Sequence, residues 1–217
     1  MVELAGSASE LHHRDSGWAA RTVALCRARD AALVLGSTQP DSDVDGDAAA
    51  ATGLEVARRR SGGGVVLVEP DALAWIDVFV PRHDGVWDPD VGRAFWWVGQ
   101  VWADVLTALG VPGADVHQDR PVTNAWSSKV CFAGVGPGEV TVGGRKVVGM
   151  AQRRTRAGAL FQCAALVRWD PRRLLDVLAL TPAEREEGLI SLGAAAAGLG
   201  PAVGVAELEQ SFVSHLP

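Results

Sequence analysis

Residues 139–150 read EVTVGGRKVVGM. Two short runs rich in valine, residues 140–142 and 146–150, flank Gly143 and Gly144. Glycine tolerates the positive φ that a two-residue hairpin turn demands, so this pattern predicts an antiparallel hairpin. Alternation along the second strand places two sets of side chains on opposite faces: Arg145, Val147 and Gly149 on one, and Lys146, Val148 and Met150 on the other.

Outward from the hairpin, other segments have the character of strands. They are short, rich in Val, Leu and aromatic residues, and bounded by Gly, Pro or Asp. We expect strands at residues 32–35, 56–60, 65–68, 73–80 and 160–167. Consecutive strands, a hairpin and separate helices predict an α+β fold, in which a mixed, largely antiparallel sheet is flanked by helices.

The longest predicted helix covers residues 89–109, where apolar side chains recur at steps of three and four. Asp88 can accept hydrogen bonds from the first-turn amides, and Pro89 has no amide hydrogen to leave unpaired. Gly110 suits the left-handed position after the last turn. The predicted apolar stripe consists of Val91, Phe95, Val98, Trp102, Val105, Leu106 and Leu109.

Capping residues predict shorter helices as well. Asp170 precedes a proline, and Thr181 begins a capping box with Glu184. Aspartates also precede the alanines of residues 48–51, where we expect them to cap a helix. The aspartates of residues 41–47 are spaced like the start of a calcium loop, but Thr52 stands where the bidentate glutamate belongs, so we expect no calcium site.

The chain has 217 residues, of which 48% are hydrophobic, and a net charge of −6. This length predicts one domain over residues 1–217, with residues 1–25 a helical or less ordered N-terminal segment. The negative charge has the wrong sign for general binding to nucleic acid or anionic membranes, so we expect neither as a partner. Three scattered cysteines favour free thiols and a cytoplasmic location. We find no secretory signal pattern and no apolar run of about 18 residues, the length of a membrane helix.

The most informative segment for function is residues 58–64, RRRSGGG, between two predicted strands. Glycines let the backbone approach a ligand closely, and arginines supply forked cationic donors, a combination that suits a phosphate or acyl phosphate. A hairpin loop with solvated arginines explains the composition equally well. The segment is not a P-loop, because no Gly-Lys-Ser/Thr follows at the required spacing.

Positive charge is concentrated in two segments. Residues 58–60 and 145–156 together hold eight cationic residues and no acidic one, in a chain that is acidic overall. If the segments meet in space, we expect a basic pocket. Lys146 has an apolar neighbour on its predicted face, so its ammonium either reaches water or pairs with a bound anion.

Three segments in this order, residues 32–39 (ALVLGSTQ), 58–64 and 144–154 (GRKVVGMAQRR), resemble the lipoate-protein ligase and octanoyltransferase family, which is related to biotin-protein ligases. The resemblance implies a class II biotin/lipoate ligase catalytic-domain fold. Many family ligases also carry a C-terminal accessory domain, for which we expect no room in 217 residues. The resemblance implies transfer of a lipoyl or octanoyl group through an acyl-adenylate, with ATP and Mg²⁺. The implied acceptor is a lysine of a lipoyl carrier domain, in the glycine cleavage H protein or a dehydrogenase E2 subunit.

The resemblance also implies site residues. Lys146 matches the lysine that contacts the acyl carbonyl and phosphate, where a fixed ammonium stabilises the negative charge that develops in the transition state. The residues that match positions lining the acyl and adenylate pocket are Arg59, Ser61, Gly62, Gly63, Gly64 and Gly149. No metal ligand is implied, and the adjacent His12 and His13 have no cysteine partner nearby that would make a metal site.

Cys131 offers a second mechanism. Followed by Phe132, it matches a Cys-Phe pair of the cysteine-dependent branch of the family, in which the thiol holds the acyl group as a thioester received from acyl carrier protein. Near Lys146 a thiolate would be a competent nucleophile, whereas in apolar surroundings Cys131 would belong to the core, as we expect for Cys26 and Cys163.

A third possibility is a non-catalytic homologue that binds the lipoyl or acyl group. Family ligases have a His-Asp pair after the glycine-rich loop, where this chain has Val68 and Glu69. They also have a His-Gly pair downstream of the lysine motif, where residues 158–163 read GALFQC.

Overall fold

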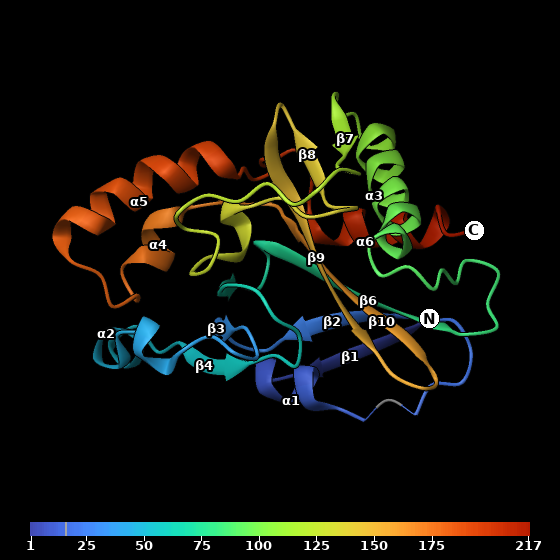
Figure 1. Cartoon of the computed structure of the whole chain (residues 1–217), viewed down its shortest axis with the longest axis horizontal. Helices are drawn as coiled ribbons and strands as arrows, with labels where there is room; N and C mark the ends of the chain where they lie inside the picture. The colour runs from blue at the N-terminus through green and yellow to red at the C-terminus, as the bar shows by residue number, and fades with distance from the viewer. Residues whose placement is uncertain (16) are drawn as a thin grey trace.

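The computed structural model describes residues 1–15 and 17–217, which form two sheets and flanking helices (Figure 1). The larger sheet has the strand order β1-β2-β6-β10-β9-β8-β7. Strands β1 and β2 are parallel, and the other neighbours are antiparallel. Its strands are β1 (Val2–Gly6), β2 (Thr22–Ala28), β6 (Leu73–Pro81), β7 (Ala114–Val116), β8 (Val140–Val142), β9 (Arg145–Arg154) and β10 (Gly158–Leu166). The predicted α+β fold with a largely antiparallel sheet is confirmed.

The smaller sheet has the order β4-β3-β5, in which β3 is parallel to β4 and antiparallel to β5. Its strands are β3 (Ala32–Leu35), β4 (Glu55–Arg58) and β5 (Val66–Val68). The helices are α1 (Ala8–His13), α2 (Gly46–Ala51), α3 (Trp96–Ala108), α4 (Pro171–Leu175), α5 (Pro182–Ala195) and α6 (Val205–Ser214). Three 3₁₀ turns are η1 (Asp41–Asp43), η2 (Arg93–Phe95) and η3 (Cys131–Ala133).

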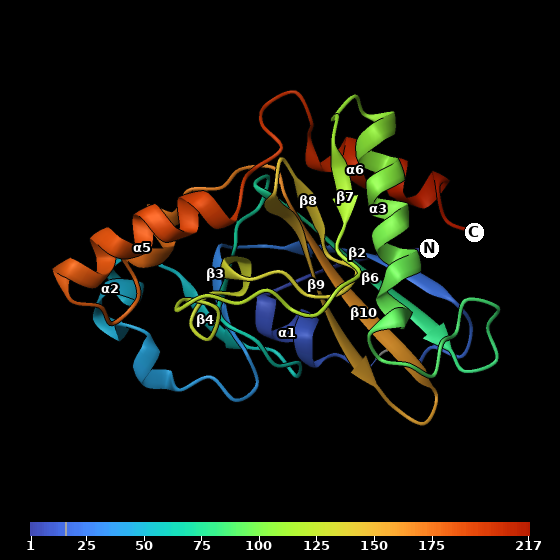
Figure 2. The same cartoon turned by 45° about the horizontal axis from the view of Figure 1, so that its top comes forward.

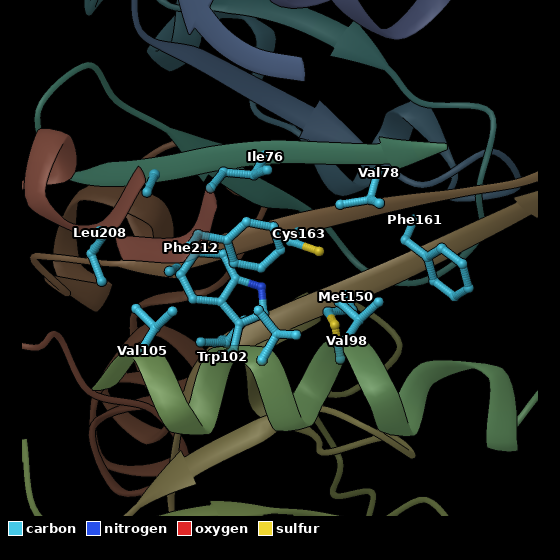
Figure 3. Close-up of a cluster of buried hydrophobic side chains, with 14 of the residues drawn as sticks. Ile76, Val78, Val98, Trp102, Val105, Met150, Phe161, Cys163, Leu208 and Phe212 are labelled. Carbon is cyan, nitrogen blue, oxygen red and sulfur yellow. The ribbon is translucent and has the colours of Figure 1, made fainter. Parts of the chain in front are cut away.

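The main core lies between the larger sheet and helices α3 and α6, which cover the same face of that sheet (Figure 2). All nine residues of β6 are buried, so this strand forms the centre of the fold. Figure 3 shows Ile76 of β6 above Trp102 of α3 and Phe212 of α6, whose rings are 4.6 Å apart. The other face of β6 meets α1 and the smaller sheet, where Trp75 packs with Val34 in a second cluster.

The predicted hairpin is confirmed, and its second strand contains a bulge. Gly143 and Gly144 have φ values of 58° and 75°, as the tight turn requires. Val140 pairs with Val148 while the next residue pairs with Lys146, so Val147 is an extra residue that interrupts the alternation. A Cβ on Gly149 would lie 3.1 Å from Lys146 Cε. The prediction that Gly149 and Lys146 occupy opposite faces is therefore wrong.

Helix α3 begins later than its sequence pattern indicates. Asp88 accepts a hydrogen bond from the amide of Asp90, and Asp90 in turn accepts one from the amide of Arg93. Arg154 also donates to carbonyl oxygens of residues 88–90. These contacts hold the chain in turns before residue 93, so Val91 is 58% exposed and does not belong to the apolar stripe. The helix ends as predicted, with Gly110 at a φ of 77°.

Several elements were not revealed by the sequence pattern. Residues 1–25, expected to be helical or less ordered, include β1 and the start of β2 as well as the short helix α1. Strand β7 and helix α6 were also not predicted. The capped helices α2, α4 and α5 are confirmed, with Asp45, Asp170 and Thr181 at their N-caps. No helix in the described part of the chain is long and apolar enough to cross a membrane.

Candidate functional site

The glycine-rich segment forms the loop between β4 and β5, and Arg59 supports it from inside. This side chain is 6% exposed. Its guanidinium donates to the carbonyl oxygens of Gly62 (2.8 Å), Gly64 (2.8 Å) and Val34 (3.3 Å). A planar group that bonds three carbonyls at once fixes the shape of the loop. The predicted site arginine therefore acts on the backbone as well as contributing positive charge.

Gly64 brings this loop into backbone contact with the segment that carries Cys131. A Cβ on Gly64 would lie 2.5 Å from the amide nitrogen of Val130, closer than any side chain can approach. On either side of this contact, the amide of Val65 donates to the carbonyl of Lys129 (2.8 Å), and the amide of Cys131 donates to the carbonyl of Val65 (3.0 Å). The absence of a side chain at residue 64 thus sets the distance between loop and cysteine.

The loop presents free hydrogen-bond donors. Within the described residues, the amides of Gly62, Gly63 and Gly64 donate to no acceptor. The hydroxyl of Ser61 is buried and likewise has no partner there. Consecutive free amides form a concave site that stabilises a phosphate or a developing oxyanion. Anion binding by the loop stays a prediction, which these unpaired donors allow.

Lys146 is buried at the start of β9, with 2% of its side chain exposed. Its ammonium is 2.7 Å from Oε2 of Glu139 and donates to the carbonyl oxygens of Cys131 (2.9 Å) and Gly134 (3.1 Å). It also lies 5.0 Å from the centre of the Phe132 ring. The two predicted alternatives, an ammonium that reaches water and one that pairs with a bound anion, are both replaced by an ion pair with a carboxylate of the chain itself.

Glu139 is a site residue that the sequence reasoning missed. Its side chain is 7% exposed, and its carboxylate accepts hydrogen bonds from the amides of Met150 (2.9 Å) and Gly136 (2.7 Å). A signal was present in the sequence: Glu139 is the only acidic residue between Asp119 and Asp170. An isolated carboxylate beside a strongly basic segment is a natural partner for a buried cation.

Two cavities meet at Cys131. The first is narrow, about 50 Å³, and lies between the two sheets with a mainly apolar wall that includes Trp75 and Phe132. The second, about 280 Å³, lies over the glycine-rich loop and contains Lys146 and Glu139 in its wall. The residues that line both cavities are Arg59, Cys131, Met150 and Ala151. Cys131 therefore lies where the wall of the apolar cavity adjoins the cavity over the glycine-rich loop.

The three cysteines differ in their surroundings. Cys26 and Cys163 are buried, as predicted, and burial raises the pKa of both thiols, to about 12 for Cys163. Cys131 is only partly buried and belongs to the wall of both cavities. The Lys146 ammonium bonds the backbone carbonyl of Cys131, so this residue lies beside Lys146, while its catalytic role stays a prediction.

The expected basic pocket does not form from all eight cations. Arg58 pairs with Asp41, and Arg60 donates to the carbonyl of His13. Arg154 is used by the turns before α3. Of the eight, only Arg59 and Lys146 line the cavity over the glycine-rich loop.

His12 contributes to the wall of the apolar cavity, a role that its sequence context did not predict. Its ring lies 4.4 Å from that of Trp75, and its Nδ1 is 3.3 Å from the side-chain nitrogen of Gln162. Burial, with a smaller effect from Arg59, lowers the pKa of His12 to about 3, so the imidazole is neutral. Residues 1–15 and 17–217 contain no group of three or more His, Cys, Asp or Glu residues suited to a metal ion.

Comparison with known proteins shows the family of the chain. The family model described as lipoyl protein ligase A/B catalytic domain matches residues 3–216. The chain belongs to this family. Octanoyltransferase LipM of Exiguobacterium sp. is 28% identical to this member of the lipoyl protein ligase A/B family over 149 residues, which are 67% of the chain and 53% of that relative. The chain thus matches about half the length of the relative.

Solved structures confirm the fold. A bi-partite lipoate protein ligase, studied with its E2 lipoyl domain from Thermoplasma acidophilum, has a TM-score of 0.75 and 18% identity, covering 98% of this chain and 80% of that one. P. falciparum LipL1 in complex with lipoate has a TM-score of 0.64 and 12% identity, with coverages of 99% and 60%. Lipoate-protein ligase A bound with ATP has a TM-score of 0.57 and 20% identity, with coverages of 89% and 80%. At these identities the likeness shows the lipoyl ligase fold alone.

Proposed function

We propose that this protein transfers an octanoyl or lipoyl group to a lysine of a lipoyl carrier domain through a thioester on Cys131. The observation that carries the proposal is the position of Cys131 where the apolar cavity meets the cavity over the glycine-rich loop. A thiol at this junction lies where the carbonyl carbon of a bound acyl chain would end. The octanoyltransferase relative supports the same assignment.

In the first step, the Cys131 thiolate attacks the carbonyl of an acyl thioester carried by acyl carrier protein. A new carbon–sulfur bond to Cys131 forms, the donor's carbon–sulfur bond breaks, and the donor leaves as a thiol after taking up the proton that Cys131 released. Negative charge develops on the carbonyl oxygen during this attack. The ammonium of Lys146 and the free amides of the Gly62–Gly64 loop are the donors that would stabilise it.

In the second step, the amine of the carrier lysine attacks the Cys131 thioester. A carbon–nitrogen bond forms, the bond to Cys131 breaks, and the proton lost by the amine returns to the thiolate. The product is an acylated lysine on a carrier such as the glycine cleavage H protein or a dehydrogenase E2 domain. The cycle needs no nucleotide.

A second candidate is ATP-dependent ligation, in which lipoate or octanoate is first converted to an acyl-adenylate. The free amides beside Arg59 favour it, because three donors and a cation suit a phosphate as well as an oxyanion. Glu139 is the only carboxylate in the wall of this cavity among the described residues, and it is bonded to Lys146. An accompanying Mg²⁺ would therefore be held mainly by the phosphates of ATP.

A non-catalytic acyl-binding role has less support. Glu69, at one position of the missing His-Asp pair, forms an ion pair with Arg173 (2.6 Å), and neither residue lines the cavities that meet at Cys131. The partners of Lys146 and the free loop donors are in place.

Intact-protein mass spectrometry separates these functions. The protein is incubated with octanoyl acyl carrier protein, and separately with lipoate, ATP and Mg²⁺, before a lipoyl domain is added. We expect an octanoyl adduct that disappears in Cys131→Ser but persists in Cys163→Ser, and that moves to the lipoyl domain. A noncovalent acyl-adenylate that forms without any covalent adduct, and lipoyl-domain acylation that survives Cys131→Ser, would overturn the thioester route and establish the ligase. No acylation under either condition would establish the non-catalytic role.

A further inference from the structure

The side chain of Lys146 has no free hydrogen in this structure. Its three Nζ hydrogens are directed to Oε2 of Glu139 (2.7 Å), the carbonyl of Cys131 (2.9 Å) and the carbonyl of Gly134 (3.1 Å). The backbone of Lys146 is held as well, because its carbonyl accepts a hydrogen bond from the amide of Ala197 (3.0 Å). Of these three acceptors only the Glu139 carboxylate is negatively charged, so it is the partner that can neutralise the ammonium and fix its position.

Backbone amides hold the Glu139 carboxylate in place. Its Oε1 accepts from the amide of Met150 (2.9 Å), and its Oε2 accepts from the amide of Gly136 (2.7 Å). Both oxygens are thus fixed to backbone groups on different segments before Lys146 is considered. A carboxylate fixed in this way can hold an ammonium in one position without the loss of side-chain freedom that weakens surface ion pairs.

The surrounding charges make this partner necessary. The ionisable groups that share the cavity wall with Lys146 are Arg59, Cys131 and Glu139. Arg59 is a second buried cation, so it offers Lys146 no negative partner. Of the described residues that line this cavity, only Glu139 is an acid, so it alone there can neutralise the Lys146 ammonium, 2.7 Å from its Oε2.

We propose that Glu139 is a positioning residue that keeps Lys146 protonated and aims it at the acyl carbonyl. The role in transfer rests on the proposed function, whereas the effect on the Lys146 charge does not. In the presence of substrate, the acyl oxygen takes the hydrogen now given to Gly134, the longest of the three contacts, while the bond to Glu139 stays. Lys146 then acts as a fixed cation and not as the base that removes the Cys131 proton.

The composition of the chain allows a direct test. Lys129 and Lys146 are its two lysines, so lysine labelled with ¹³C and ¹⁵N gives two side-chain signals in an NMR spectrum, which Lys129→Arg assigns. The signals are followed against pH in the wild type, Glu139→Gln and Glu139→Asp. Gln has nearly the shape of Glu but no charge, and Asp keeps the charge. Glu209→Gln is the matched control. Glu209 is another buried carboxylate, 2% exposed, and it pairs with Arg27; both residues are distant from Lys146 in the sequence.

We expect Lys146 to lose its proton at a lower pH in Glu139→Gln than in the wild type, because the carboxylate 2.7 Å from the buried ammonium has lost its charge. In Glu139→Asp the loss stays near the wild-type pH, and in Glu209→Gln it does not move. The alkaline decline of the transfer rate shifts with the NMR signal, and Glu139→Gln lowers kcat about 100-fold at neutral pH. A general loss of stability would lower the amount of folded protein without moving either pH value.

Two results would overturn the proposal. One is a Lys146 signal in Glu139→Gln that titrates as in the wild type. The other is a wild-type Lys146 that is already a neutral amine at pH 7, a result that decides the question even if Glu139→Gln does not fold. Because the NMR signal does not depend on turnover, a protein without transferase activity would refute the proposed function and leave the Glu139 measurement intact.

Discussion

Replacing Gly64 with alanine tests the contact that joins the glycine-rich loop to Cys131. The added Cβ would lie 2.5 Å from Val130 N and 2.6 and 2.7 Å from the carbonyl carbon and oxygen of Lys129. These are backbone atoms, so the two segments must separate by about 1 Å to reach ordinary carbon contact distances. Separation weakens the hydrogen bonds at 2.8 and 3.0 Å that flank the contact.

Two backbone hydrogen bonds at about 0.5–1.5 kcal/mol each give a loss of about 1–3 kcal/mol in the free energy of unfolding. A displacement of about 1 Å between nucleophile and oxyanion donors costs about 100-fold in rate. Both are measurable: urea denaturation gives the stability, and the rate of octanoyl transfer to a lipoyl domain, followed by mass, gives the activity.

The matched control is Gly193→Ala in α5, where an added Cβ meets nothing within 4 Å. Because alanine favours a helix, this variant should be as stable as the wild type or more stable, with an unchanged transfer rate. The reasoning fails if Gly64→Ala transfers within twofold of Gly193→Ala while both are folded.

Three further predictions concern single side chains. Lys146→Ala should abolish transfer. It should also lower the free energy of unfolding by about 3–5 kcal/mol, because it leaves the Glu139 carboxylate buried without its ammonium partner. A loss of activity with unchanged stability in urea would contradict the buried ion pair. His12 should make the protein acid-sensitive, because its pKa is lowered from 6.5 to about 3 on folding, and the unfolded chain binds a proton there that the folded chain does not. As the pH is lowered from 6.5, the free energy of unfolding should therefore decrease by up to about 1.4 kcal/mol per pH unit, and it should decrease less steeply in His12→Phe. Equal slopes of the free energy of unfolding against pH in the two proteins, from pH 6.5 to 4, would refute this. Iodoacetamide at pH 8 should label the native protein once, at Cys131, because the thiols of Cys26 and Cys163 are buried. Equal labelling of Cys163, measured by peptide mapping, would argue against its burial.

Local patterns predicted much of the fold because the responsible interactions lie within a few residues. The turn at Gly143 and Gly144 and the cap at Thr181 are set by φ preference and by side-chain bonds to nearby amides. The predicted start of α3 was wrong because Arg154, which is distant in the sequence, bonds the turns that precede the helix. Strand β1 has five residues, of which only Gly6 is buried, and it depends on its partner β2, so its pattern alone did not distinguish it.

The site divides in the same way. The glycine-rich loop, Lys146 and Cys131 were predicted as site residues from a family resemblance, and the structure places them around two cavities that share part of their walls. Glu139 was missed because its role depends on an ion pair that forms only when the start of β9 and the residue before β8 are side by side. Gly149 was assigned to the wrong face because a bulge, which depends on the partner strand, shifts the alternation.

The scarcity of lysine has a consequence for side reactions. An acyl thioester reacts with neighbouring amines, and an enzyme that stores one is exposed to attack by its own side chains. Of the 20 basic Lys and Arg residues, 18 are arginines, whose guanidinium groups stay protonated and do not attack. Lys146 is bound on all three hydrogens, and Lys129 lies 4.0 Å from the carboxylate of Asp43. If the proposed thioester forms on Cys131, the protein's own side chains offer it few amines, which would favour transfer to the amine of a carrier.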